Sequence, residues 1–243
     1  MAALTKILEI LFDIDEMKAW GKVWRETIGT DGKAKKANCF DKKQGMDFGK
    51  FIDPVIANAL SQMLGGISIE KPTNNKALIP PKADCVEIGD TKVIGGVRSQ
   101  NFDLVYRPDG IRIAYDSKTL NDEKSIMKNW NNMINDLTAE ATTVHTRFPY
   151  ALVLFFIVIP KAALKENQAA DIIRTLERMN ERIGVQEENH KAESVALVIW
   201  DTETGEIDSL VPEADSSLRL EKFGDRVEDI YISRYKGLPP HDR

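Results

Sequence analysis

Apolar residues recur at three- and four-residue spacing in four stretches of the chain, and this spacing is typical of amphipathic helices. The second stretch starts at Asp53-Pro54, which is typical of a helix cap followed by the first helical residue, and Gly65-Gly66 is expected to end it. The pattern therefore predicts helices over residues 4–28, from Asp53 to the glycine pair, from Asn121 or Asp122 to Val144, and around residues 169–183.

Shorter runs between these helices have the alternating or continuously apolar character of β-strands. The best-defined pair is Asn101–Tyr106 and Ile111–Lys118, joined by the turn sequence Arg107-Pro108-Asp109-Gly110. The run Ala151–Ile159 is apolar throughout, as expected of a strand covered on both faces. Further strands are predicted at Cys85–Ile88, Lys92–Val97, Val195–Trp200 and Glu206–Val211, with a connector rich in Pro and Asn over residues 67–83.

This order of elements predicts an α/β fold with a mixed central β-sheet flanked by helices and with a helical N-terminal region. We expect one domain over residues 1–243, with the helical region at 1–66 and the mixed-sheet core at 84–211. The composition agrees with this prediction, because 42% of the residues are hydrophobic and 29% are charged, which is ordinary for a globular chain.

Several classes of protein are excluded by simple features of the chain. The longest apolar run, Tyr150–Ile159, is about half of the roughly 20 residues that a membrane-spanning helix needs. The first residues are interrupted by Lys6 and Glu9 and lack the cleavage site of a signal peptide. Neither Cys39 nor Cys85 lies in a metal-binding motif. We therefore expect a cytoplasmic protein with no membrane partner.

The net charge of −5 is unevenly distributed along the chain. Residues 91–165 carry ten Lys or Arg against seven Asp or Glu, a net charge of +3, whereas residues 166–243 carry ten against eighteen, a net charge of −8. The middle of the chain is thus the part that we expect to face phosphates. A lysine-rich segment that includes Lys35 and Lys36 is predicted to be an exposed loop that either contacts phosphates or is simply solvated.

Two aspartates and a lysine on the best-defined hairpin are the candidate chemical groups. Residues i and i+2 of a strand share a face, so Asp116 and Lys118 point the same way. If Arg107 pairs with Gly110 across the turn, Asp103 is the diagonal neighbour of Asp116 on that face, about 7–8 Å away at the backbone. The opposite face is apolar, so we expect these three groups to be displayed on one side of a packed hairpin.

Carboxylates that converge repel each other unless a cation lies between them, and Mg²⁺ with oxygen ligands and several waters suits the pair formed by Asp103 and Asp116. Such a metal polarises a phosphodiester and lowers the pKa of a bound water, while a nearby lysine such as Lys118 orients that water and offsets the charge of the transition state. The chemistry indicated is hydrolysis of a phosphodiester.

These residues resemble the PD-(D/E)xK nucleases, and among them the type II restriction endonucleases. The similarity covers Asn101-Phe102-Asp103, the triplet Asp116-Ser117-Lys118 and the following helix, about 60 residues in all. It implies that Asp103 and Asp116 are metal ligands and that Lys118 is the catalytic lysine. The chain departs from the usual motif at Asn101-Phe102, where proline often precedes the first acid, and has Asp116 where Glu is as common.

The resemblance implies more about the site and its partners. Some members recruit an acid from the preceding helix through a Gly-x-x-x-Glu pattern, and Gly49 to Asp53 is similar, although Asp53 is also explained as a helix cap. The implied function is a Mg²⁺-dependent type II restriction endonuclease of a prokaryotic cytoplasm, which binds double-stranded DNA as a homodimer. The predicted DNA-binding residues are Lys124, Lys128, Asn131, Asn132, Asn135, Lys35 and Lys36.

Other interpretations of the same residues stay open. The hairpin charges are also compatible with unrelated surface groups, with Asp116 paired to Lys118 or Arg112. Asp84 with Asp90-x-Lys92 is a rival for the catalytic motif, although a turn also explains it. The alternative functions are a structure-specific or repair nuclease of the same fold, and a non-catalytic module that binds DNA or a protein partner.

Overall fold

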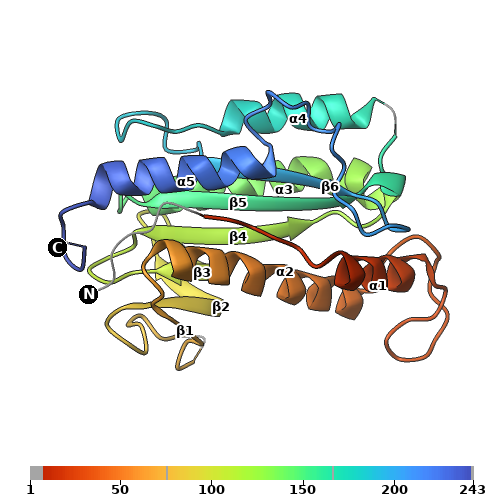
Figure 1. The fold of residues 1–243 in the computed structure, drawn as a ribbon, viewed down its shortest axis with the longest axis horizontal. Coiled ribbons are helices and arrows are strands. Elements are labelled where there is room, and N and C mark those ends of the chain that lie inside the picture. The colour runs from red at the N-terminus through yellow and green to blue at the C-terminus, as the bar shows by residue number, and fades with distance from the viewer. Residues whose placement is uncertain (1–7, 75, 166, 242–243) are drawn as a thin grey trace.

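A computed structural model describes residues 8–241 of the chain, except residues 75 and 166. Six strands form one mixed sheet in the order β1-β2-β3-β4-β5-β6 (Figure 1). The β2–β3 and β3–β4 pairs are antiparallel and the other pairs are parallel. The strands are β1 (Ser68–Glu70), β2 (Cys85–Ile94), β3 (Ser99–Tyr106), β4 (Ile113–Thr119), β5 (Leu152–Pro160) and β6 (Ser194–Trp200).

Five α-helices flank this sheet, so the predicted α/β fold with a mixed central sheet is confirmed. Helices α2 and α5 pack on one face and helices α3 and α4 on the other (Figure 1). Neighbouring residues of β5 illustrate both faces, since Phe156 belongs to the α2 and α5 core and Phe155 to the α3 and α4 core. The helices are α1 (Ile14–Arg25), α2 (Lys42–Met63), α3 (Glu123–His145), α4 (Gln168–Met179) and α5 (Leu220–Tyr235).

The N-terminal helices differ from the prediction in where they begin. The predicted helix over residues 4–28 is shorter, because Asp13 accepts hydrogen bonds from the first-turn amides and caps α1 at Ile14. Residues 8–13 before it form no helix, and residues 4–7 lie outside the described residues. Helix α2 begins eleven positions before the predicted start, at a capping box in which Asp41 and Gln44 satisfy each other's backbone amides.

The interpretation of Asp53 as a helix cap is therefore wrong. Asp53 lies in the interior of α2, and Pro54 is tolerated inside this 22-residue helix. Its carboxylate therefore does not cap the helix, and it faces Asp103 and Ser117 in the sheet.

The strands of the N-terminal half also differ in detail from the prediction. The run Cys85–Ile88 and the first part of the run Lys92–Val97 belong to one strand, β2, which ends at Ile94 and whose register shifts between Ile88 and Thr91. The Gly89-Asp90 pair is thus a bulge rather than a turn between strands, which removes the geometric basis of the rival site at Asp84 and Asp90. Strand β1 lies inside the predicted connector, where three residues are too few to show a period.

The predicted register of the central hairpin is wrong by two residues. Arg107 does not pair with Gly110, because the connection runs over residues 107–112 and the last rung joins Tyr106 to Ile113. Both arginines of this connection, Arg107 and Arg112, are buried, and Arg107 forms a bidentate ion pair with Glu87. The predicted apolar face of the hairpin is only partly right, because Leu104 and Tyr115 pack in the α2 and α5 core whereas Phe102 packs in the α3 and α4 core.

The C-terminal third differs most from the prediction. The expected strand Glu206–Val211 makes only one isolated bridge, between Trp200 and Ile207. Helix α5 was not predicted, and it buries Phe223, Val227 and Tyr231 against the sheet. No helix among the described residues is both long and apolar enough to cross a membrane.

Candidate active site at a split in the sheet

Strands β3 and β4 separate within the sheet, and the candidate residues lie where they part. The β3–β4 ladder ends at Leu104 and Tyr115, whereas β3 stays paired with β2 as far as Ser99 and β4 stays paired with β5 as far as Thr119. The ends of both strands are therefore held on their outer sides and open to each other, which leaves room for side chains between them.

Asp103 and Asp116 are the first residues beyond the last rung, and continuing the register places them directly opposite each other. This is closer than the diagonal arrangement predicted from the sequence. Asp103 Oδ2 accepts hydrogen bonds from the Ser117 backbone N–H at 2.9 Å and from Ser117 Oγ at 3.1 Å, in place of the missing ladder partner. The Asp103 and Asp116 carboxyl groups are also close enough for a hydrogen bond between them.

Helix α2 brings a third carboxylate near Asp103 and Ser117. A methyl group at Gly49 would make an ordinary van der Waals contact with Ser117 Oγ, at 3.9 Å. One turn later, Asp53 faces both Ser117 and Asp103. The Gly-x-x-x-Asp spacing noted in the sequence thus places the glycine against the strand and the carboxylate at the split.

Lys118 lies between two carboxylates that come from different elements. Its ammonium is paired with Asp116 Oδ2 on its own strand and with Glu140 Oε1 on α3, the latter at 3.2 Å. Gln100 of β3 donates to the same Glu140 oxygen at 3.0 Å. The lysine is therefore fixed on the α3 side of the strand split, next to Asp116.

The expectation that these groups are displayed on an open surface needs correction. Helix α3 covers this face of the sheet, so the residue Asp116 is only 7% exposed and the Lys118 side chain 25%. The sequence pattern could not reveal this cover, because an alternating strand looks the same whether its polar face meets water or a polar pocket under a helix.

The site has more carboxylates than cationic side chains, and this imbalance affects their pKa values. Burial raises the pKa of Asp53 to about 8, and the charge of Asp103 adds to the effect. Burial also raises the pKa of Asp116 well above its usual value, although Lys118 opposes the shift. Burial would lower the pKa of Lys118, but Asp116 and Glu140 outweigh it and raise that pKa. Lys118 therefore stays charged and is shared by the carboxylates of Asp116 and Glu140.

These residues fit a divalent cation. Asp53 Oδ1 and Glu140 Oε2 are buried oxygens with no hydrogen-bond partner in the described part of the chain. No three His, Cys, Asp or Glu side chains within that part already converge as a metal-binding group. Mg²⁺ needs only one or two carboxylates because it keeps several waters, so Asp103 and Asp116, with Asp53 beside them, are a sufficient ligand set.

Most of the predicted DNA-binding residues are exposed on α3. Lys128 and Asn132 are two of them, and their spacing of four continues through Asp136 to Glu140, which is paired with Lys118. This row therefore leads along the helix surface from solvent to the site. The exposed predicted residues of α3 are Lys124, Lys128, Asn131, Asn132 and Asn135.

The two lysines predicted in the N-terminal loop have different environments. The Lys35 ammonium donates to the carbonyl oxygens of Cys39 at 2.6 Å and Trp24 at 3.3 Å, so it holds the loop together. Lys36 is exposed and close enough to Glu123, at the start of α3, to affect its pKa. Only Lys36 of this pair is positioned as a contact for a phosphate near α3.

A cleft lies on the other side of the site. It has a volume of about 490 Å³, and Asp53 lines it together with Lys50 and Lys71. The candidate site is thus flanked by lysines on two sides, from α3 with the N-terminal loop and from this cleft. Such an arrangement suits a polyanion that passes across the strand split.

Three residues of the site were missed from the sequence, namely Glu140, Gln100 and Ser117. Glu140 lies on the predicted third helix, and the only available signal was an acid within its apolar stripe, one residue before Ala141. Comparisons of the chain with protein-family models, curated proteins and solved structures found no match. The geometry of the site is therefore the only basis for a function.

Proposed function

We propose that this protein is a Mg²⁺-dependent endodeoxyribonuclease of the PD-(D/E)xK type, most similar in kind to a type II restriction endonuclease. The single observation that carries the proposal is the strand split, where Asp103 and Asp116 face each other and Lys118 lies beside them. Asp53 supports it, because its carboxylate faces Asp103 and Ser117 from the preceding helix.

Each residue has a chemical role in this proposal. Asp103 and Asp116 hold the cation, and Asp53 lies near enough to add a ligand directly or through a water. When bound, Mg²⁺ supplies Lewis-acid polarisation of the phosphodiester. Lys118 remains positively charged, orients the attacking water and stabilises the charge that develops on the phosphate. Glu140 and Gln100 keep the lysine in place.

Double-stranded DNA is the proposed substrate. Lys36, Lys124 and Lys128 on one side and Lys50 and Lys71 on the other provide phosphate contacts. The exposed asparagines of α3 carry donors and acceptors that suit base edges. A homodimer is proposed because two-fold symmetry of the protein matches two-fold symmetry of a duplex site.

Digestion of a long linear DNA with Mg²⁺ tests the proposal. Discrete bands are expected from a sequence-specific enzyme. The Asp116→Ala and Lys118→Ala variants should lose at least about 10²-fold to 10³-fold in cleavage rate, the range seen when a single stabilising group is removed. Both should retain DNA binding in a gel-shift assay, because the phosphate contacts lie elsewhere.

Controls separate this function from its alternatives. The Asp90→Ala variant removes the acid of the rival motif on the β2 bulge and should cut like the wild type. Cleavage restricted to nicked or branched DNA would indicate a structure-specific nuclease. Full activity of the Asp116→Ala or Lys118→Ala variant, or no cleavage of any DNA together with no binding of Mg²⁺, Mn²⁺ or Ca²⁺ in calorimetry, would refute the proposed site.

A further inference from the structure

A groove with acidic walls lies on the α2 and α5 face of the sheet, away from α3. It is formed by the extended segment 8–14, the loop 205–209 and the first turns of α5, and its volume is about 830 Å³. Two close backbone contacts fix its walls: a methyl group on Gly224 would lie 2.5 Å from the Leu8 carbonyl oxygen, and one on Gly205 would lie 2.4 Å from the Ile14 carbonyl oxygen.

The lining of this groove combines apolar surface with negative charge of a single sign. Leu11 and Ile14 are 71% and 54% exposed at its edge, which is unusual for large apolar side chains. The five charged residues that line the groove are all acidic, and no Lys or Arg is among them. They are Glu9, Glu206, Glu221, Asp225 and Glu228.

Glu228 is the residue that points to a ligand. It is only 9% exposed, lines the groove, and makes no hydrogen bond or ion pair with any part of the chain that the structure describes. The Glu228 carboxylate oxygens remain open to the groove, where an entering cation can pair with them. Asp225 lies one turn and Glu221 two turns before it on the same side of α5, so the negative charge extends along the groove.

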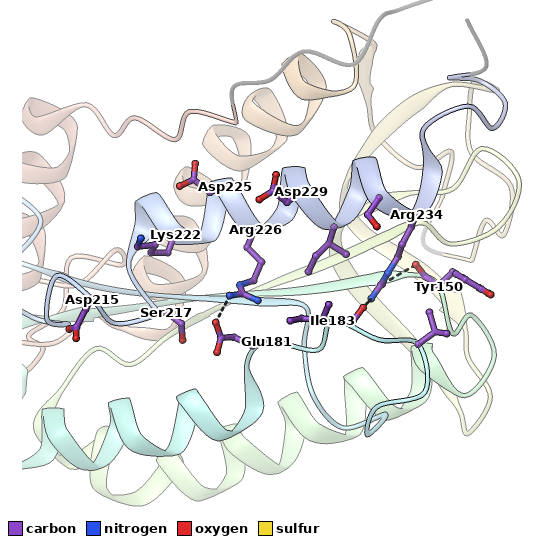
Figure 2. A pocket seen from close by; sticks show the side chains of 13 residues that line it. Tyr150, Glu181, Ile183, Asp215, Ser217, Lys222, Asp225, Arg226, Asp229 and Arg234 are labelled. Atoms are coloured by element: carbon purple, nitrogen blue, oxygen red, sulfur yellow. Dashed lines mark hydrogen bonds and ion pairs between the residues drawn. The ribbon is translucent and has the colours of Figure 1, made fainter.

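The neighbouring pocket on the other side of α5 shows the opposite situation. Figure 2 shows Arg226 and Arg234 reaching down from the helix, whereas Asp225 and Asp229 point to its other side. Arg226 is paired with Glu181, and Arg234 donates to Glu193 at 2.9 Å. In that pocket the protein supplies counter-charges of its own. In the groove Glu221 is paired with Arg219 at 3.3 Å, whereas Glu228 has no cationic partner among the described residues.

We infer that this groove binds a basic amphipathic segment of a partner protein. In the bound state an Arg or Lys side chain pairs with Glu228, and apolar side chains of the same segment cover Leu11 and Ile14. A macromolecular partner is favoured over a small polycation, because the exposed apolar side chains at the edge are covered only by a ligand with apolar groups of its own. The inference is independent of the nuclease activity, since the groove shares no residue with the strand split.

Selection of peptides from a random display library on the immobilised full chain provides the probe. We expect the selected sequences to combine Arg or Lys with large apolar residues. A synthetic peptide of the selected sequence should bind the Glu228→Gln variant at least tenfold more weakly than the wild type, and Asp225→Asn should weaken it less. Glu213→Gln, in a different acidic region, serves as the matched control and should bind like the wild type.

Each contrary outcome overturns the inference. Selected peptides without cationic residues, no enrichment at all, or equal affinity for the wild type and Glu228→Gln would each exclude this role. Inhibition by spermidine alone, with no dependence on Leu11→Ser, would identify a small polycation as the ligand. Self-association in sedimentation that Glu228→Gln abolishes would identify a second copy of this chain as the occupant. Thermal melting of Glu228→Gln verifies folding, and the exposed Asp225 gives a second variant at the same groove.

Discussion

The buried charges around Glu193 and those at the strand split differ in whether they are satisfied. Glu193, the residue before β6, accepts hydrogen bonds from Arg182, Arg234 and the Val153 amide at 2.8–2.9 Å, and His145 lies 3.0 Å from its second oxygen. Burial opposes the ionisation of Glu193, but these neighbours overcome it and lower its pKa. At the strand split, burial instead raises the pKa values of Asp53 and Asp116, and the buried Asp53 Oδ1 has no hydrogen-bond partner among the described residues.

This difference separates a structural cluster from a candidate functional one. A buried carboxylate surrounded by donors stabilises the fold in its ionised form and needs nothing further. Several carboxylates that face each other with a single lysine are short of positive charge, and such perturbed groups are typical of active sites. Burial alone would not have distinguished the two, because both clusters lie largely away from solvent.

The largest expected effect comes from breaking the satisfied cluster. Glu193→Gln leaves the buried Arg182 guanidinium without its counter-charge and should destabilise the protein by about 3–5 kcal/mol, as loss of one partner of a buried ion pair does. The matched change Asp116→Asn, made without metal, should cost less than 1 kcal/mol or stabilise the protein. Unfolding in urea measures both, and equal losses would remove the distinction between the clusters.

Addition of Mg²⁺ should sharpen the comparison. A cation that binds only the native protein stabilises it by about 2.7 kcal/mol at a concentration of one hundred times its Kd. We expect this gain in the wild type at pH 8 and its loss in Asp116→Asn, with Ca²⁺ as a second cation that tests binding apart from cleavage. A similar gain in both proteins, measured by thermal melting, would place the cation elsewhere.

The stability of the metal-free protein should depend on pH through the unsatisfied cluster. The pKa of Asp53 is about 8 in the native state, above the usual 3.8, so the native state keeps a proton that the unfolded state releases. Stability should therefore fall as the pH rises from about 4 to about 8, and each pKa unit corresponds to about 1.4 kcal/mol. In EDTA, Asp53→Asn should flatten this slope. An unchanged slope would show that Asp53 does not titrate in this range.

The smallest effect concerns the route by which DNA reaches the site. Lys128→Ala should weaken DNA binding modestly and should reduce the slope of log K against log salt concentration by about 0.9, the value for one phosphate contact. Lys222→Ala on α5, where the nearby charges are mainly acidic, is the matched control. Fluorescence anisotropy at several salt concentrations measures both slopes, and equal changes would place the DNA away from α3.

The sequence by itself determined the class of the fold and the identity of the three central residues of the candidate site. The buried strand 152–160 and the strand 194–200 follow from continuous apolar runs, because a strand covered on both faces has no polar side. Asp116 and Lys118 share a side for the same local reason, the two-residue period of a strand. The hydrophobic period of a strand is visible within a few neighbouring residues, so a single sequence is enough to predict it.

Only the tertiary structure decided how these residues meet. The β3–β4 split depends on partners on both outer sides of the sheet, and the approach of Asp53 and Glu140 depends on helices 50 residues before and 37 residues after Asp103. The true start of α2 at Asp41 changed Asp53 from a cap into a site residue. Contacts between distant elements follow from packing of whole faces, and a single sequence carries no local signal for them.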